Sequence, residues 1–76
     1  MKFKYIEWLD ACGRSGWSEG GSLRPLPIIS CGVVAEETKE YITLASSRHA
    51  DEEENVCDGL ICIPKNYITK TRNIKL

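Results

Sequence analysis

The side chains best suited to chemistry are one histidine and four cysteines: His49, Cys12, Cys31, Cys57 and Cys62. Structural zinc sites usually take their thiolates from two close pairs, with about two to four residues inside each pair. Here only Cys57 and Cys62 are close, with four residues between them. Two disulfides are the other option. The spacing favours free thiols that pack as small hydrophobic side chains, and we expect no metal and no cofactor.

A catalytic constellation is not visible in the sequence. His49 lies in a polar stretch without an evident nucleophile, and a nucleophile–base pair needs fixed geometry. Nothing brings the carboxylates Glu7, Asp10 and Asp58 together. The segment Gly13-Arg14-Ser15-Gly16 lacks the lysine-serine ending of a phosphate loop, although a backbone nest for an anion is an alternative there. We therefore expect that the protein is not an enzyme.

Aromatic and basic residues are the candidates for binding. Trp17 lies in the middle of the glycine-rich stretch 10–25, either as an exposed anchor for a partner or as a side chain that pins the loop onto the core. In a nucleic-acid binder, tyrosines and tryptophans would stack bases while lysines and arginines contact phosphate. The predicted binding residues are Trp8, Trp17, Arg14, Tyr67 and Lys65.

Length and charge limit the class of protein. Seventy-six residues allow one domain, residues 1–76, and the net charge of −1 argues against bulk electrostatic binding to nucleic acid or to an anionic membrane. The charge is uneven, because residues 36–58 carry eight acids against two bases while residues 59–76 carry four bases and no acid. The sequence has no signal-peptide pattern and no apolar stretch of membrane-spanning length, so we expect a cytoplasmic protein.

The pattern of β-branched and aromatic residues predicts strands and no helix. Residues 10–25 and the acidic stretch 47–55 read as loops, residues 36–40 as a polar turn, and Pro64 to Asn66 as one turn of 3₁₀ helix. In the first strand the alternation of faces slips, which suggests a bulge near Tyr5-Ile6 or burial on both sides. Gly32 would allow a bend. The expected strands are residues 2–9, 27–35, 41–47, 56–63 and 67–74.

These elements predict an all-β fold, a small five-stranded barrel, closed or partly open, with a long loop after the first strand. Closing such a barrel places the first strand beside the fifth. A basic patch would then form from neighbouring positions on the two strands: Lys2, Lys4, Lys70 and Arg72.

The stretch Ile63-Pro64-Lys65-Asn66-Tyr67-Ile68 resembles the turn before the last strand of SH3 domains, where a proline, an asparagine and a tyrosine help to line a peptide groove. The resemblance covers six residues. The opening Ala-Leu-Tyr-Asp-Tyr motif and the paired tryptophans of that family are missing. The resemblance therefore implies SH3-like topology rather than recognition of proline-rich peptides.

A broader resemblance links most of the chain to small uncharacterised bacteriophage-encoded proteins. It implies expression in the host cytoplasm and engagement of a host or phage protein, without catalytic residues to carry over. The matching segments are Trp8-Leu9-Asp10, Gly16-Trp17, Gly32-Val33-Val34, Glu36-Glu37, Tyr41-Ile42-Thr43-Leu44-Ala45 and Ile63-Pro64-Lys65.

Three functional hypotheses follow. The first is an accessory protein that binds a host or phage protein and modulates it, in host takeover or counter-defence. The second is a small barrel that binds nucleic acid or a nucleotide. The third is a structural subunit that acts through homo-oligomerisation, which the marginal size of the chain makes plausible.

Overall fold

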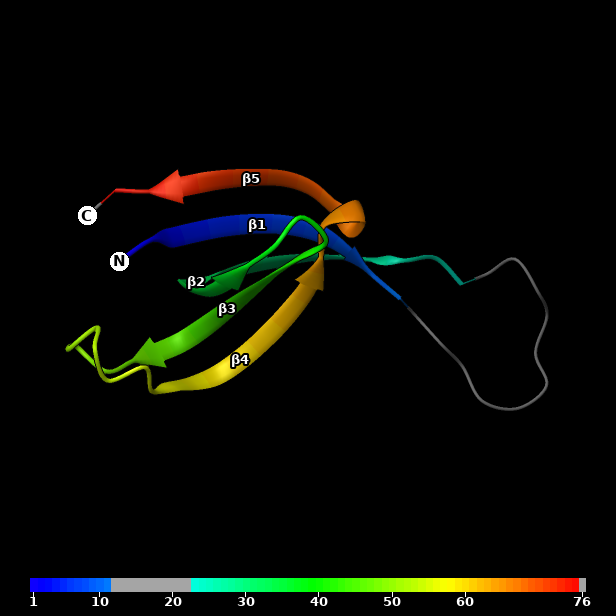
Figure 1. Cartoon of the computed structure of the whole chain (residues 1–76). Coiled ribbons are helices and arrows are strands. Elements are labelled where there is room, and N and C mark those ends of the chain that lie inside the picture. Colours follow the sequence, from blue (N-terminus) through cyan, green and yellow to red (C-terminus); the bar gives the residue numbers. More distant parts are fainter. Residues whose placement is uncertain (12–22, 76) are drawn as a thin grey trace, which may run out of the picture.

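The computed structural model describes residues 1–11 and 23–75, which form one antiparallel sheet of five strands and a single 3₁₀ turn. The strand order is β4-β3-β2-β1-β5 (Figure 1). The all-β prediction is confirmed, with strand ends displaced by at most a few residues. The elements are β1 Phe3–Asp10, β2 Leu26–Glu37, β3 Tyr41–Arg48, β4 Cys57–Pro64, η1 Lys65–Tyr67 and β5 Ile68–Ile74.

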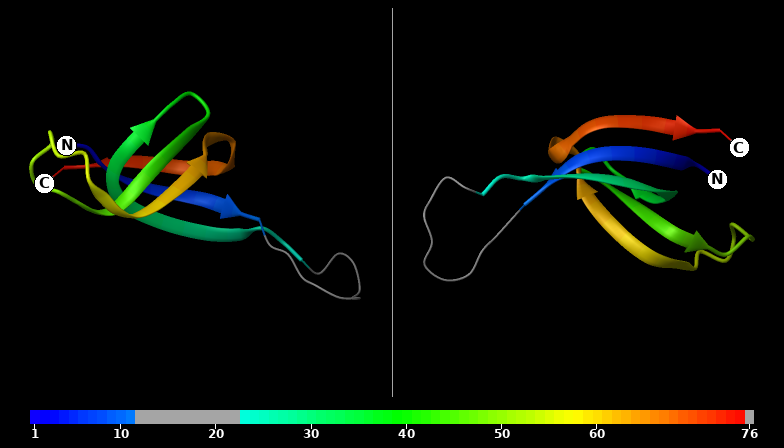
Figure 2. Two further views of the ribbon diagram at one scale, coloured as in Figure 1. Left: turned by 60° about the horizontal axis from the view of Figure 1, so that its bottom comes forward. Right: turned by 180° about the vertical axis from the view of Figure 1, so that it is seen from behind.

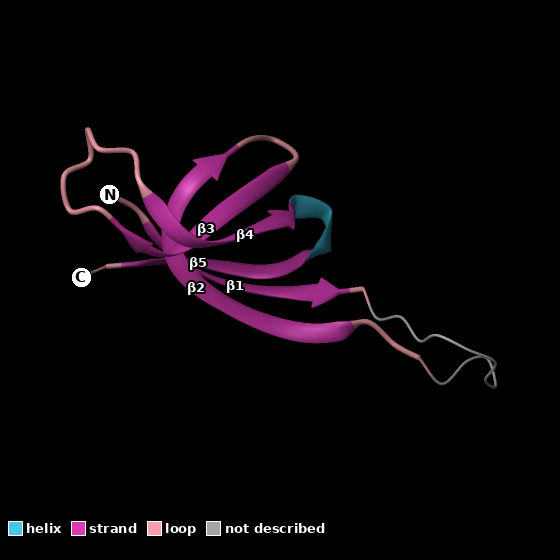
Figure 3. Ribbon diagram, turned by 90° about the horizontal axis from the view of Figure 1, so that it is seen from below, coloured by secondary structure: helices cyan, strands magenta, loops and turns pink. Residues whose placement is uncertain are grey.

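Strand β2 is shared between two halves of the sheet. Residues 26–33 pair with β1, and residues 33–37 pair with β3. Val33 lies where the two ladders meet, opposite both Phe3 and Ala45. The ladder with β3 skips Ala35, a β-bulge, which increases local bending. The strand therefore curves from one half of the sheet to the other (Figures 2 and 3).

Gly32 permits this curvature, as the sequence suggests. A Cβ atom at this position would lie 2.5 Å from the carbonyl oxygen of Ala45 in β3. Real Cβ atoms do not approach backbone this closely, so a larger residue would push β2 and β3 apart. The absence of a side chain at Gly32 is what lets the two strands come together at the bend.

The core lies between the two halves of the sheet. One half contributes Ile6 and Trp8 from β1, and the other contributes Ile42 and Leu44 from β3 and Ile63 from β4. The indole Nε1 of Trp8 donates a hydrogen bond to Ser30 Oγ at 3.1 Å, which satisfies the one polar atom of a buried ring. Ile28, Val34 and Ile68 pack around this cluster.

The bulge expected near Tyr5-Ile6 is not there. The β1–β2 ladder runs without interruption from Phe3 to Asp10. The irregularity lies in the β1–β5 ladder, where Glu7 pairs with Lys70 and Trp8 pairs with Ile68, so that Thr69 is the extra residue. Its hydroxyl donates to the carbonyl oxygen of Glu7 at 3.1 Å.

The apparent slip in the first strand has a simple cause. Lys4, Ile6 and Trp8 share the inner face in ordinary alternation, and the side chain of Lys4 is only 17% exposed. A lysine can bury its aliphatic stem while its ammonium group stays near water. The sequence pattern misleads because it counts every lysine as an outward-facing residue.

Pairing of β1 with β5 is confirmed by six residue pairs. Strands β4 and β5 are the two edges of the sheet, and the described residues contain no ladder between them; η1 connects them instead. No described segment is a helix with the length and apolar character needed to span a membrane.

The thiols that the structure describes are free. Cys31 and Cys62 are exposed on β2 and β4, and Cys57 is half-buried at the start of β4. Cys12 lies outside the described residues. Within residues 1–11 and 23–75, no group of three or more metal-ligating side chains comes together.

Candidate functional site

A groove of about 320 Å³ lies at the end of the sheet where β1 stops and η1 begins. We call it the Tyr67 groove. Three of the elements described above meet there, together with the residue that leads into β2. Its lining residues are Leu9, Asp10, Ala11, Pro25, Asn66, Tyr67 and Thr69.

The local sequence explains how η1 presents Tyr67. Pro64 ends β4 in an extended conformation, because it has no amide hydrogen for a further ladder bond. The amide of Lys65 then donates to the carbonyl oxygen of Glu40 at 2.8 Å, which ties the turn to the β2–β3 connection. The amide of Ile68 donates back to the carbonyl oxygen of Lys65 and closes the single 3₁₀ turn. This turn leaves Tyr67 47% exposed.

The Tyr67 groove combines apolar contact area with a few polar groups. The ring of Tyr67 and the side chain of Leu9, which is 41% exposed, provide apolar contact area. Asn66 offers an amide that can donate and accept hydrogen bonds, and Asp10 is the one carboxylate among the described lining residues. Small-molecule and peptide sites combine apolar walls with a few polar groups in this way.

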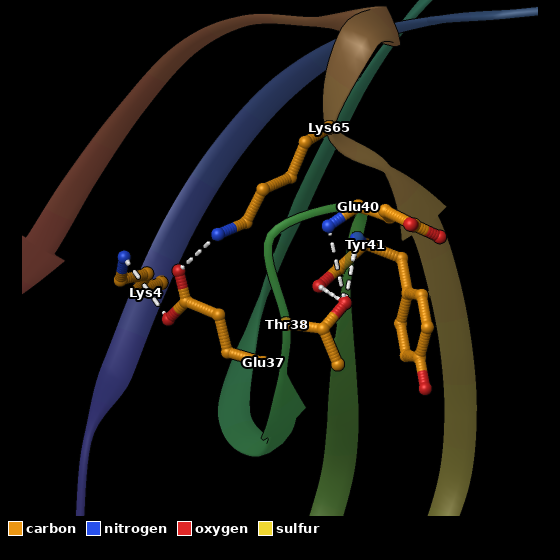
Figure 4. Close-up of polar contacts among 6 residues, drawn as sticks. All are labelled: Lys4, Glu37, Thr38, Glu40, Tyr41 and Lys65. Atoms are coloured by element: carbon orange, nitrogen blue, oxygen red, sulfur yellow. Dashed lines mark hydrogen bonds and ion pairs between the residues drawn. The ribbon is translucent and has the colours of Figure 1, made fainter.

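A second cavity, of about 270 Å³, lies on the inner face of the sheet. We call it the Glu37 cavity. Glu37 stands between two lysines at its rim, with Lys65 Nζ 2.8 Å from Glu37 Oε2 and Lys4 Nζ 3.7 Å from Glu37 Oε1 (Figure 4). The hydrogen bond from Lys65 lowers the pKa of Glu37 below its ordinary value of 4.5. The remaining lining residues are Ile6, Ile42, Ile68 and Thr71.

The turn between β2 and β3 fixes the position of Glu37. The hydroxyl of Thr38 accepts hydrogen bonds from the amides of Glu40 and Tyr41, both at 3.1 Å. The amide of Thr38 donates to the carbonyl oxygen of Tyr41 at 2.9 Å. On the other side of β2, the Tyr41 hydroxyl donates to Glu36 at 3.1 Å, and this bond raises the pKa of Tyr41. A threonine whose side chain satisfies the turn amides holds the turn in one conformation.

The structure separates the three predicted binding residues that it describes. Tyr67 lines the Tyr67 groove, and Lys65 reaches toward Glu37 in the other cavity. Trp8 is 7% exposed and belongs to the core, so its ring faces are covered by protein. Arg14 and Trp17 lie outside the described residues.

Sequence reasoning missed Leu9, Asp10 and Glu37 as candidate site residues, and it reached Asn66 only through the resemblance of the turn that contains it. The signal for Leu9 and Asp10 was present, because pairing of β1 with β5 brings the end of β1 to the turn that precedes β5. Glu37 gave no such signal, since a glutamate in a polar run normally reads as a solvated residue.

The expected basic patch does not form as one surface. Arg72 pairs opposite Tyr5, and Lys70 pairs opposite Glu7, with 3.9 Å between their charged groups. Lys4 lies on the other face of β1, beside Glu37. Successive residues of a strand face opposite sides of a sheet, so basic residues on neighbouring strands come together only when their paired positions lie on the same face.

The acidic loop between β3 and β4 is held by local contacts. Glu52 pairs with the amino group of Met1 at 2.9 Å, which lowers the pKa of Glu52. Arg48 donates to the carbonyl oxygen of Glu52 at 3.0 Å. His49 Nδ1 accepts a hydrogen bond from the amide of Asp51, so the imidazole stabilises the backbone of the loop.

Comparisons of the chain with protein-family models, with curated proteins and with solved structures each find no match. The functional argument therefore depends on the surfaces of the molecule itself. Of those surfaces, the Tyr67 groove combines an exposed aromatic ring with the carboxylate of Asp10, and the Glu37 cavity combines isoleucine side chains with paired charges.

Proposed function

We propose that the chain is a non-catalytic protein-binding module with an SH3-like barrel. In this proposal it is a bacteriophage-type accessory protein that engages a host or phage protein in the host cytoplasm and modulates it. The observation that carries the binding role is the Tyr67 groove, an apolar surface with an exposed tyrosine and the carboxylate of Asp10. The phage assignment depends on the sequence resemblance.

Two features support the SH3-like assignment. The order β4-β3-β2-β1-β5 gives β2 to both halves of the sheet, and a 3₁₀ turn precedes the last strand. The groove also lies at the turn that carries the sequence resemblance, and Asn66 and Tyr67 line it. The fold and the groove therefore support the same assignment from different residues.

The chemistry of the groove suggests its ligand, an extended segment of a partner protein. Tyr67 and Leu9 suit an aliphatic or aromatic side chain of the partner, and Asp10 suits a lysine or arginine next to it. A surface this small buries well under about 1,200 Å² in a complex, which is typical of weak and transient association. We expect a Kd on the order of micromolar for a single peptide.

A peptide-display selection against the immobilised chain tests this proposal. Enriched peptides should combine apolar residues with a basic residue, and their binding should be measured by fluorescence polarisation. Tyr67→Ala should weaken binding by about thirtyfold, the effect of losing a contact of about 2 kcal/mol. Ile29→Ala is a matched control, because Ile29 is 63% exposed on β2 and does not line the groove.

Equal binding by wild type and Tyr67→Ala, or equal losses in Tyr67→Ala and Ile29→Ala, would contradict the groove as the site. Thermal unfolding of each variant shows whether the fold is retained. Removal of an exposed side chain should change stability by less than about 0.5 kcal/mol.

The alternative function, binding of nucleic acid or a nucleotide, has one supporting observation. A hollow of about 390 Å³ on the outer face is lined by Tyr5, Lys70, Arg72, Asn73 and Ile74. It offers one aromatic ring and two cations, a minimal stacking and phosphate-binding surface. Binding of fluorescently labelled single-stranded DNA at low salt, measured by fluorescence polarisation and lost in Arg72→Ala, would favour this function over protein binding.

A further inference from the structure

Strand β4 ends the sheet on one side, and its outer main-chain edge is open. Among the described residues, β4 pairs with β3 alone (Figure 1). Residues 58–62 are all exposed. They include two large apolar side chains on opposite faces of the strand, Leu60 at 60% and Ile61 at 38% exposure. An open edge with exposed apolar residues is a place where another strand can add to a sheet.

The hydrogen bonds of the β3–β4 ladder show which residues face this edge. The amide of Lys65 donates to the carbonyl oxygen of Glu40 at 2.8 Å, one step beyond the last pair of the ladder. In an antiparallel ladder, pairs that exchange main-chain hydrogen bonds alternate with pairs that do not. The ladder is continuous over residues 60–64, so Ile61 and Ile63 bond toward β3.

Leu60 and Cys62 therefore turn their amide and carbonyl groups toward the open edge. Pro64 faces the same way and has no amide to offer, which is the usual placement of a proline in an edge strand. Before Leu60 the ladder is interrupted at Gly59, which has a φ of +66° and is not paired with Ser46. The edge that can accept another strand is therefore short, residues 60–62.

We propose that this edge binds a second copy of the chain, with the two β4 strands antiparallel about a two-fold axis at Ile61. Leu60 of each copy exchanges main-chain hydrogen bonds with Cys62 of the other, because both residues face the edge. The two Ile61 side chains meet across the axis on one face of the sheet, and Leu60 meets Cys62 on the other face. Such a contact uses the same surface on both copies.

The remaining positions of β4 suit its own copy as the added strand. Asp58 is the one charged residue of β4, and in this register it lies opposite Pro64 of the second copy, so it meets no like charge. Ile63, which is 0% exposed, lies opposite Gly59 of the second copy. Glycine has no side chain that could displace the residues covering Ile63. The sequence of β4 is therefore complementary to itself in this register.

The short edge sets the strength of the dimer. A contact over so few residues buries well under about 1,200 Å², the size of weak and transient interfaces. We expect a Kd on the order of 100 μM. The described residues that line the Tyr67 groove include none from β4, so the inference does not depend on the proposed function.

Sedimentation velocity of the full chain tests the inference. Between about 10 μM and 1 mM, the wild-type protein should pass from monomer to dimer. Leu60→Lys should weaken the dimer by at least about tenfold, because association would bring a charge into the contact. Ile29→Lys is the matched control, since Ile29 has a similar exposure, 63%, and lies on β2. It should leave the dimer unchanged.

Hydrogen exchange measured by nuclear magnetic resonance tests the register on the wild-type chain. The amides of Leu60 and Cys62 face the edge, so their exchange should slow by about fivefold from dilute solution to 1 mM, as the monomer fraction falls to about one fifth. The amide of Ile61 already bonds toward β3 and should be protected at both concentrations.

Cross-linking provides a third test. Directly opposite residues that do not exchange hydrogen bonds have Cα atoms about 4.5 Å apart, within the range of a disulfide. On oxidation with diamide, Ile61→Cys should therefore form a covalent dimer well above the level of the wild-type chain, and Ile29→Cys should not.

A chain that stays monomeric up to 1 mM, equal weakening by Leu60→Lys and Ile29→Lys, or concentration-dependent protection on other strands without Leu60 and Cys62 would each overturn the inference. Circular dichroism shows whether each variant folds. If Leu60→Lys fails to fold, hydrogen exchange of the wild-type chain still decides whether β4 is the contact.

Discussion

The bend of β2 gives the sharpest stability prediction, the effect of Gly32→Ala. The new Cβ would lie 2.5 Å from the oxygen and 3.3 Å from the carbon of the Ala45 carbonyl group. Both are main-chain atoms of β3, which is also paired with β4, so they cannot rotate away as a side chain does. Overpacking of this kind costs about 1–3 kcal/mol. Gly32 is not among the glycines with positive φ, so alanine also recovers about 0.4–1 kcal/mol by restricting the unfolded chain.

With central values of about 2 kcal/mol lost and about 0.7 kcal/mol recovered, the expected net loss is about 1.3 kcal/mol, which is large for a chain of 76 residues whose total stability is on the order of 4–11 kcal/mol. It should lower Tm by about 5–10 °C, measured by circular dichroism and checked by urea unfolding. Wild-type stability in Gly32→Ala would refute the reasoning, because it would show that β2 and β3 are not held at this distance.

Gly59→Ala is a useful comparison. Gly59 has a φ of +66°, and its added Cβ would meet Ser46 Oγ at 2.6 Å. That hydroxyl can rotate, although it then gives up its hydrogen bond to the carbonyl oxygen of Gly59, but Ser46 Cβ would also lie 2.9 Å from the new atom and can move only with β3. This variant should lose stability through strain at its own residue and through this contact, and because Ser46 is exposed the core methyl signals should shift less than in Gly32→Ala.

Three further predictions concern the core and the charges. Ile63→Ala removes a side chain that is 0% exposed and should lower the free energy of unfolding in urea by about 2–5 kcal/mol. Leu60→Ala, on the same strand at 60% exposure, should lower it by less than about 0.5 kcal/mol, and similar losses in both variants would contradict the assigned faces of β4. The pKa of Glu37 is lowered in the folded protein, so its ion pairs stabilise the fold above the ordinary pKa of 4.5, and this contribution is lost as the pH falls through the folded pKa. The difference in stability between wild type and Glu37→Gln should therefore disappear between about pH 7 and pH 3. A difference that persists in acid would argue against the ion pairs as its source. Trp8→Phe and Ser30→Ala should show a coupling of about 1 kcal/mol in a double-mutant cycle, and purely additive effects would contradict the 3.1 Å hydrogen bond.

Local residue preference predicted the strands well, because propensity and breakers act over short distances. Pro64 marks the end of β4, and the following 3₁₀ turn lies within a residue of its expected place. The polar segment 36–40 was predicted less well. Glu36 and Glu37 continue β2 as strand residues, because pairing with Thr43 and Ile42 outweighs the low strand preference of glutamate.

The candidate sites depend on tertiary neighbours, and for that reason the sequence showed them only in part. Tyr67 was identified from the turn that contains it, but Asp10 becomes relevant only when β1 ends beside that turn. Lys4 looked like a surface charge, because its sequence position does not reveal that its stem lies on the inner face. Trp8 looked like a stacking platform, although the packing of the two sheet halves places it in the core.

The two outer strands of the sheet differ in how well they resist association. On β5, Lys70 and Arg72 discourage another chain from adding to the sheet, as charged edge residues do in many β proteins. Strand β4 exposes Leu60 and Ile61 and carries Asp58 as its one charged side chain. Self-association in concentrated solution should therefore start at β4. A lysine at position 60 would discourage strand addition at this edge, as Lys70 and Arg72 do at β5.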